Sequence, residues 1–287
     1  STITNNLPAG GLRIIGTASD SLSGVKQVYV SVDGGPFQPA QGTNNWTNQV
    51  YRVRETNIQI KAYAVDNAGN TSSTYSISVN VDRTYLGNGE YNFWASLIKD
   101  VYVKSSSGGG LVVDIVISNA ANDDHNLYVL VDVTNMTTGH QPPPTGWCGD
   151  WYTGWGDFWF TNTAGINADF VVWGWIDNPF PRTLQQTNAR KIVSGVTNSV
   201  SVSHTMTYIS GADHIYSFTI PYASIGSGAS SGQVVNIYVF YGLSGGTPGN
   251  QGMRSIFPAG VSVTASGGWG HYIVNVTNKS IDYVLNP

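Results

Sequence analysis

Charged side chains are scarce in this sequence. They make up 10% of its 287 residues, less than half of the roughly 25% that is usual for a soluble domain. The net charge is -4, and the lysines and arginines form no basic run, so we expect no nucleic-acid partner. Serine, threonine, asparagine, glutamine and glycine occupy the surface instead. Such a surface suits contact with sugars, sheet edges or other copies of the chain.

Cysteine is almost absent, because Cys148 stands alone. A disulfide framework is therefore excluded, as is a zinc or iron–sulfur site built from several cysteines. The five histidines show no metal-ligand spacing, although His204 and His214 flank an expected hairpin and could approach each other. We expect no metal and no cofactor.

Long hydrophobic runs are also missing, and none approaches the roughly 20 residues of a membrane-spanning helix. No signal peptide precedes Ser1, and we interpret this first residue as a processed terminus. Together with the low charge, Asn-x-Ser/Thr sequons indicate an extracellular or cell-surface glycoprotein. The predicted glycosylation sites are Asn45, Asn70, Asn135, Asn275 and Asn278.

Glutamate is limited to Glu55 and Glu90, which we assign to different domains. A glycoside hydrolase of the usual kind needs two carboxylates across a cleft, whereas the aspartates here stand mostly in turns. Gly228–Gly232 matches the G-x-S-x-G pattern, but it lies in a Gly/Ser loop rather than between a strand and a helix. The sequence therefore predicts a protein that is not an enzyme.

The dominant pattern that is present is period-two alternation of apolar and polar residues, and no segment holds a helical period for three turns. This predicts an all-β protein. The first part has a tight hairpin signal at Asp33–Gly35 and reads as a small sandwich. Its expected strands are Leu12–Ile15, Val25–Val32, Trp46–Val53, Ile58–Val65 and Tyr75–Val81.

A polar segment, Asp82–Gly89, precedes a shift toward tryptophan, and we place a domain boundary there, giving domains 1–83 and 84–287. The second domain is long for a domain with a single core, and its length predicts a larger β-sandwich or jelly roll. Its expected strands are Phe93–Tyr102, Leu111–Ile117, Tyr128–Val133, Phe170–Trp175, Ile215–Ile220, Val234–Tyr241 and Tyr272–Val276.

Two motifs of the first domain carry a family resemblance. The runs Asp20–Gly35 (DSLSGVKQVYVSVDGG) and Lys61–Asn70 (KAYAVDNAGN) resemble the immunoglobulin-like modules of bacterial and archaeal surface proteins, in particular the second domain of glucodextranases. The resemblance implies an immunoglobulin-like sandwich. The turn chemistry agrees, since DNAGN tolerates left-handed residues.

Four segments of the second domain, Val129–Val133, Ala168–Trp175, Ile220–Gly226 and Met253–Ile256, resemble the C-terminal domain of glucodextranases and archaeal amylopullulanases. That domain is related to family 9 carbohydrate-binding modules and DOMON domains. The resemblance implies a β-sandwich that binds carbohydrate. The acidic, calcium-type opening common in those domains is absent, because Gly87–Tyr91 stands in its place.

A tryptophan loop lies within Gln141–Phe160, and the glycines between its rings argue against a helix. Three interpretations stay open: the rings plug one end of the sandwich, contact another subunit, or stack on sugar rings while Asp150 and Asp157 bond the hydroxyls. The tryptophans, which recur every four residues, are Trp147, Trp151, Trp155 and Trp159.

The N-terminal residues Ser1, Thr2, Ile3 and Thr4 can form a strand ahead of a Gly10-Gly11 hinge. Two alternatives are open, namely donation of this strand to another copy and a first strand within its own domain.

Two functions are compatible with these features. The first is a non-catalytic structural or adhesive subunit of an extracellular assembly, a filament or a layer, that binds copies of itself. The alternative is a carbohydrate-binding accessory region of an extracellular glycan-degrading enzyme, with a surface or polymeric glycan as partner. We prefer the first, because no catalytic domain accompanies the sandwiches.

Overall fold

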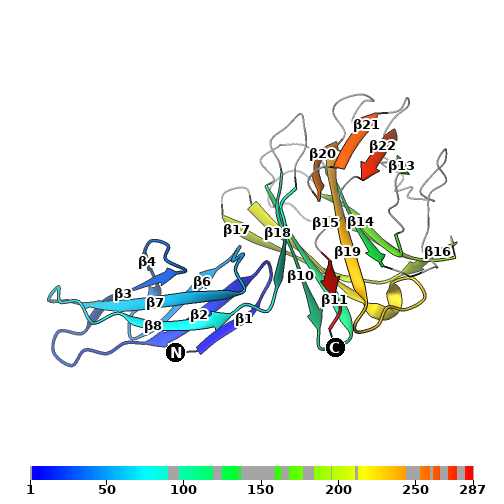
Figure 1. Cartoon of the computed structure of the whole chain (residues 1–287). Helices are drawn as coiled ribbons and strands as arrows, with labels where there is room; N and C mark the ends of the chain where they lie inside the picture. Colours follow the sequence, from blue (N-terminus) through cyan, green and yellow to red (C-terminus); the bar gives the residue numbers. More distant parts are fainter. Residues whose placement is uncertain are drawn as a thin grey trace. The chain divides into compact units, whose positions relative to one another are not determined.

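The protein is nearly all β (Figure 1), which confirms the predicted fold class. Tyr222–Ser224 forms one 3-10 turn, and no helix among the described residues has the length and apolar character needed to cross a membrane. The computed structural model describes residues 2–89, 97–118, 125–134, 136, 159–162, 168–176, 184–194, 196–210, 213–243, 253–258, 261–265, 271–276 and 282–286.

The chain divides into two compact units, Ser1–Tyr85 and Leu86–Pro287. The boundary that we placed from the sequence falls just before this division. Each unit has its own hydrophobic core.

The N-terminal unit contains two four-stranded sheets, ordered β1-β2-β6-β5 and β4-β3-β7-β8. Inward residues of both sheets, among them Ile14, Val28 and Ile60, share one core with Trp46. The strands are β1 Thr2–Leu7, β2 Gly11–Thr17, β3 Val25–Val32, β4 Gln38–Pro39, β5 Gln41–Gly42, β6 Asn45–Val50, β7 Asn57–Asp66 and β8 Tyr75–Asn80.

The two motifs of the immunoglobulin-like resemblance meet in this unit. The backbone N–H of Asn67 donates to the carbonyl of Gly24 at 3.0 Å, and its side-chain amide donates to the carbonyl of Ser23 at 2.8 Å. Asp20 Oδ2 accepts from the backbone N–H groups of Ser23 and Gly24, each at 2.7 Å. The motif residues therefore fix two turns against each other.

The C-terminal unit is a larger sandwich. Its five-stranded sheet is ordered β17-β18-β11-β10-β9 and its seven-stranded sheet β16-β15-β14-β12-β19-β20, with β23 also pairing β19; a third sheet is β13-β22-β21. The bounds are β9 Thr84–Gly87, β10 Ile98–Ser106, β11 Gly110–Ser118, β12 His125–Val133, β13 Trp159–Asn162, β14 Phe170–Ile176, β15 Leu184–Val193, β16 Val196–Val200, β17 Ser203–Ser210, β18 Asp213–Pro221, β19 Val234–Leu243, β20 Met253–Phe257, β21 Val261–Ala265, β22 His271–Val276 and β23 Tyr283–Val284.

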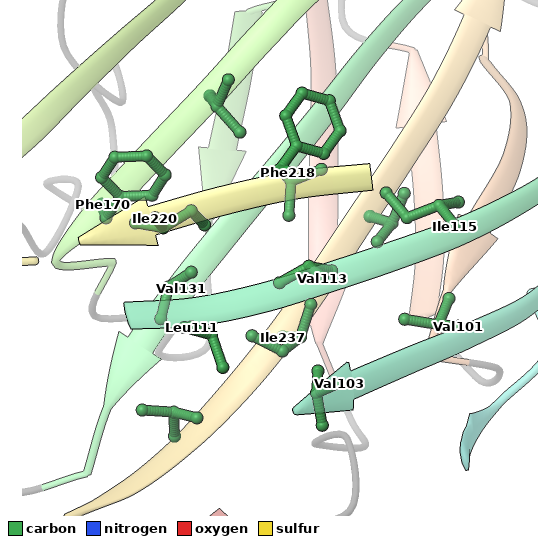
Figure 2. Packing of buried hydrophobic residues seen from close by; sticks show 14 of the residues in the cluster. Val101, Val103, Leu111, Val113, Ile115, Val131, Phe170, Phe218, Ile220 and Ile237 are labelled. Atoms are coloured by element: carbon green, nitrogen blue, oxygen red, sulfur yellow. The ribbon is translucent and has the colours of Figure 1, made fainter. Parts of the chain in front are cut away.

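One cluster of buried side chains joins the five-stranded and seven-stranded sheets (Figure 2). Val113 and Phe218 come from the five-stranded sheet, and Val131, Phe170 and Ile237 from the seven-stranded sheet. All five side chains are fully buried. The two sheets therefore pack face to face around one core, and β11 is buried at all but its last position.

Candidate functional site

Most of the predicted tryptophan site lies outside the described residues. Trp159 begins β13, whose backbone pairs in parallel with β22, placing Trp159 opposite His271. The three interpretations of the loop all stay predictions. The positions outside the description are Trp147, Asp150, Trp151, Trp155 and Asp157.

The N-terminal segment pairs within its own domain. Thr2, Ile3 and Thr4 lie in β1 opposite Ile15, Ile14 and Arg13 of β2, while Ser1 lies outside the described residues. This arrangement matches the alternative in which Ile3 starts the domain's own first strand. Donation to another copy would first require breaking this pairing.

The predicted mobile hinge is instead a tight turn. Ala9 and Gly10 have φ values of 51° and 65°, and the N–H of Gly11 donates to the carbonyl of Pro8 at 2.9 Å. Two consecutive left-handed residues are typical of a two-residue hairpin turn. The turn folds β1 back onto β2, so the expectation of a hinge that reaches outward is wrong.

The predicted glycosylation sites are only partly described. Asn45 lies exposed at the start of β6 and Asn70 is exposed in a turn, where its side-chain amide donates to Asp66 at 2.8 Å. Asn275 lies in β22. Asn135 and Asn278 fall outside the described residues, and glycosylation stays a prediction at all five.

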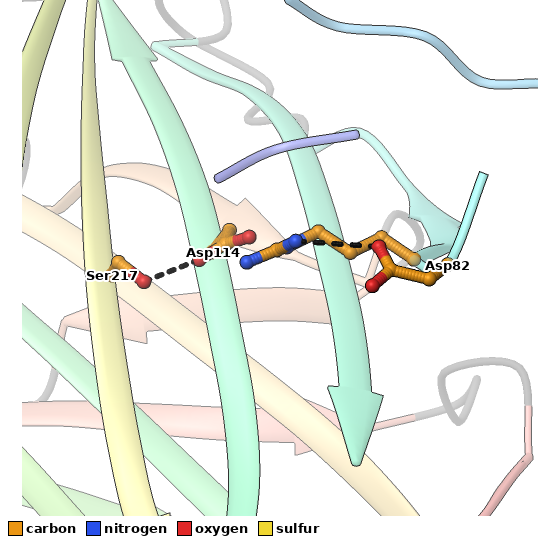
Figure 3. Close-up of polar contacts among 4 residues, drawn as sticks. Asp82, Asp114 and Ser217 are labelled. Atoms are coloured by element: carbon orange, nitrogen blue, oxygen red, sulfur yellow. Dashed lines mark hydrogen bonds and ion pairs between the residues drawn. The ribbon is translucent and has the colours of Figure 1, made fainter. Parts of the chain in front are cut away.

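The C-terminal unit buries carboxylates that serve structural contacts. Asp114 of β11 is fully buried and accepts a hydrogen bond from Ser217 of β18 (Figure 3). Asp169 is also fully buried and accepts the backbone N–H of Val133 at 2.7 Å. Burial, with a smaller contribution from the charge of Asp132, raises the pKa of Asp169 to about 7. Neither carboxylate is exposed to solvent.

The remaining catalytic or metal-binding candidates are not assembled. His204 lies opposite Phe218 and His214 opposite Tyr208, so the two histidines do not face each other. Gly228–Gly232 leads directly into β19 and lacks the following helix of a nucleophile elbow. Within the described part of the chain, no group of three or more histidine, cysteine, aspartate or glutamate residues could hold a metal ion.

An aromatic cluster on the N-terminal unit is the strongest candidate site. Val28 and Val30 of β3 point into the core, so Tyr29 between them points to the outward face of the sheet. Tyr29 lies opposite Tyr63 of β7, and the two rings stack with centroids 5.2 Å apart and planes at 22°. Phe37 completes the cluster with its centroid 4.8 Å from that of Tyr63, in edge geometry.

Hydrogen bonds around the β3–β4 hairpin hold Phe37 near the tyrosines. Asp33 and Gly34 both have positive φ, as the predicted hairpin turn requires. The hydroxyl of Ser31 donates to the carbonyl of Gly35 at 2.6 Å. The side-chain amide of Gln27 donates to the carbonyl of Ala40 at 2.8 Å, which ties β3 to the strand beyond the hairpin. The cluster is therefore built on a well-anchored element.

Polar residues border the aromatic cluster on the same face. Ser31 lies opposite Lys61, and Lys61 lies opposite Ser76 of β8, so these three residues form the adjoining row. All three rings keep part of their surface accessible, and Phe37 is 37% exposed. The arrangement offers an apolar surface beside hydrogen-bonding groups.

The sequence analysis did not select these aromatic residues. Tyr29 and Tyr63 stand in two correctly expected strands, but only the register brings them together. The sequence did contain a signal for their orientation. Each tyrosine stands between two apolar residues of a strand, so its side chain must point away from the core.

No protein-family model and no curated protein match this chain. Among solved structures it is similar to chitinase ChiA74 from Bacillus thuringiensis, at 13% identity and a TM-score of 0.24, over 82% of this chain and 28% of that one. It is also similar to a cycloalternan-degrading enzyme from Trueperella pyogenes in complex with isomaltose, at 10% identity and a TM-score of 0.23, over 83% of this chain and 31% of the enzyme. The chain thus spans less than a third of either protein. TM-scores this low do not establish a shared fold.

Proposed function

We propose that this chain is a carbohydrate-binding accessory region of an extracellular glycan-degrading enzyme, without catalytic activity of its own. The observation that supports this is the aromatic cluster of Tyr29, Phe37 and Tyr63. It lies on the outward face of a sheet whose inward face already forms a complete core. Neighbouring aromatic rings that stay accessible to water are typical of surfaces that contact a partner.

Sugar rings fit this surface chemically. The C–H groups on one face of a pyranose are apolar and stack on aromatic rings, whereas the hydroxyls around its edge need hydrogen bonds. Tyr29 and Tyr63 each combine an apolar ring with a hydroxyl. Lys61 and Ser76 in the adjoining row supply further donors. The three rings of the cluster carry no formal charge, which suits a neutral polysaccharide.

The anchoring of the cluster reduces the cost of binding. Tyr29 and Tyr63 already pack against each other, and the hairpin that carries Phe37 is fixed by the bonds of Ser31 and Gln27. Side chains held in place before binding lose little conformational entropy when a ligand arrives. A modest contact area can therefore yield measurable retention on a polymer that offers many sites.

The other function considered from the sequence, a structural or adhesive subunit of a filament or layer, has weaker support. Its proposed donor segment, Thr2–Thr4, is occupied in pairing with β2. The carbohydrate-binding accessory function therefore takes first place.

The test compares polysaccharide retention of the intact chain with that of a Tyr29→Ala/Tyr63→Ala double variant. Insoluble α-glucan, β-glucan, xylan and chitin would be used in sedimentation assays. We expect the intact chain to be retained by at least one polymer, and the double variant to bind that polymer roughly tenfold or more weakly, because stacking area is lost. Tyr75→Ala is the matched control, since Tyr75 is 62% exposed but lies on β8 opposite Ala62, on the other face of the sheet.

Retention of the double variant equal to that of the intact chain would reject the aromatic cluster as the site. Failure of the intact chain to bind any polymer of the panel would reject the proposed function. Thermal unfolding of each variant shows whether lost retention reflects lost structure.

A further inference from the structure

The five-stranded sheet of the C-terminal unit ends in an edge strand, β17. Its eight residues, SHTMTYIS, pair with β18 on one side, and in the described topology no strand lies on the other side. An edge of this kind presents unpaired backbone N–H and C=O groups that can accept a further strand.

The β17 edge has few of the features that usually block such pairing. Natural sheets protect their edges with charged residues, proline, bulges or very short strands. The sequence of β17 has no lysine, arginine, aspartate, glutamate, proline or glycine. Its register with β18 is regular from Ser203 to Tyr208 and shifts once, between Tyr208 and Ser210 at the end of the strand.

The other described edge strands carry a charge or are shorter. Arg254 stands in β20. The edge strands β4 and β5 have 2 residues each, and β9 and β13 have 4 each. The remaining uncharged edge strands are β1 and β8 with 6 residues each and β16 and β21 with 5 each, so β17 is the longest described edge without a charge.

The strand is also held in a conformation ready to pair. Met206 packs against the core of the sandwich, which fixes the middle of β17 in the sheet. Ser203, His204 and Thr205 are exposed, and Tyr208 is 50% exposed. The edge is therefore accessible while its backbone is already extended, so little ordering is needed for another strand to add.

We infer that β17 pairs with β17 of a second copy of this chain, antiparallel about a two-fold axis, so that two five-stranded sheets become continuous. An axis through Met206 places Thr205 opposite Thr207 and His204 opposite Tyr208, each pair on one face of the joined sheet. Threonine pairs and aromatic pairs are favourable across strands, and no two formal charges meet at neutral pH. The strand is thus complementary to itself.

The contact is a weak one by its size. Pairing of five residues per copy, His204 to Tyr208, buries far less than the roughly 1,200 Å² of a stable interface. We expect a reversible dimer that forms at high protein concentration, as on the surface of a polymer that retains the chain. This inference concerns a different unit from the aromatic cluster and does not depend on sugar binding.

Sedimentation equilibrium of the intact chain between about 1 µM and about 1 mM tests the dimer. We expect the average mass to rise with concentration toward that of a dimer. Thr205→Lys places a charge on the edge and should weaken self-association at least roughly tenfold. Ser78→Lys on the β8 edge is the matched control, because Ser78 is exposed, the variant makes the same change in charge on another edge strand, and it should associate like the intact chain.

A monomer at every concentration would overturn the inference, and so would Thr205→Lys associating as strongly as the intact chain. Equal loss of association in Thr205→Lys and Ser78→Lys would assign the effect to net charge or to another edge and would also overturn the inference. Circular dichroism in the near ultraviolet confirms that each variant is folded. Loss of association in Thr205→Lys alone, with its fold intact, supports the β17 contact.

Discussion

At the scale of single residues, Asp169 is the most perturbed acid in the described part of the C-terminal unit. Its Oδ2 accepts a hydrogen bond from Val133, whereas its buried Oδ1 has no hydrogen-bond partner. The pKa of Asp169 is raised from 3.8 to about 7, chiefly by burial. Between these two values the folded chain keeps a proton that the unfolded chain has released. The free energy of unfolding must therefore fall as the pH rises through this range.

We predict that Asp169→Asn removes this pH dependence. Asparagine retains a carbonyl that can accept the N–H of Val133 but cannot ionise. Denaturant unfolding at a series of pH values from about 4 to about 8 should show a decline in stability for the intact chain and a flatter profile for the variant. The quantity to compare is the slope of the free energy of unfolding against pH, because the new amide N–H of the variant changes the stability equally at every pH. Parallel profiles would show that Asp169 does not titrate in this range.

A second residue-scale feature is Gly16, which lies opposite Trp46 in the pairing of β2 with β6. A Cβ atom at this position would lie 2.1 Å from the Trp46 ring. The absence of a side chain therefore lets the indole lie across β2 and fill the core of the N-terminal unit.

We predict that Gly16→Ala destabilises the N-terminal unit by roughly 1–3 kcal/mol, because the indole must move out of a packed core. Trp46→Leu alone also destabilises the unit, but the alanine should cost less in that background. A double-mutant cycle by denaturant unfolding measures this coupling. Additive effects would show that the ring and the glycine do not constrain each other.

At the scale of elements, strands with a strong alternating pattern were predictable. The expected strand Val25–Val32 has the bounds of β3, since each valine that points inward is followed by a residue that points out. The turn at Asp33–Gly35 was predictable for a similar reason, because its residues tolerate positive φ. These are local properties, and a sequence displays them directly.

Other strands were missed because they carry little apolar contrast. β15 (LQQTNARKIV) has polar residues at most of its positions. The core-facing side of β17 holds His204, Met206 and Tyr208. Two of these three residues are partly polar, so the sequence of this edge strand does not alternate clearly between apolar and polar residues. The aromatic cluster was missed for a different reason. It depends on the register between β3 and β7 and on a hairpin residue, Phe37, and a single sequence does not specify such pairings.

At the scale of the whole molecule, the chain combines two sandwiches with very few ionisable groups. Its two glutamates do not form a pair that the structure describes, since Glu55 is exposed in the N-terminal unit and Glu90 lies outside the described residues. The buried aspartates accept hydrogen bonds from neighbouring strands.

We predict that the purified chain does not hydrolyse α-glucans, β-glucans or peptides, because the described residues bring together neither a pair of catalytic carboxylates nor an activated nucleophile. Reducing-sugar and peptide-release assays, with an authentic hydrolase as the positive control, check this expectation. Turnover on the order of 1 per second or faster that stays with the protein through purification would contradict it.

The uncharged character of the aromatic cluster and of β17 has a consequence for the environment in which the protein can work. Ring stacking and main-chain pairing do not depend on attraction between ions, so dissolved salt has little to screen. Apolar contacts are strengthened by salts such as sulfate. We therefore predict that the proposed sugar binding and β17 pairing persist in brine as well as in fresh water.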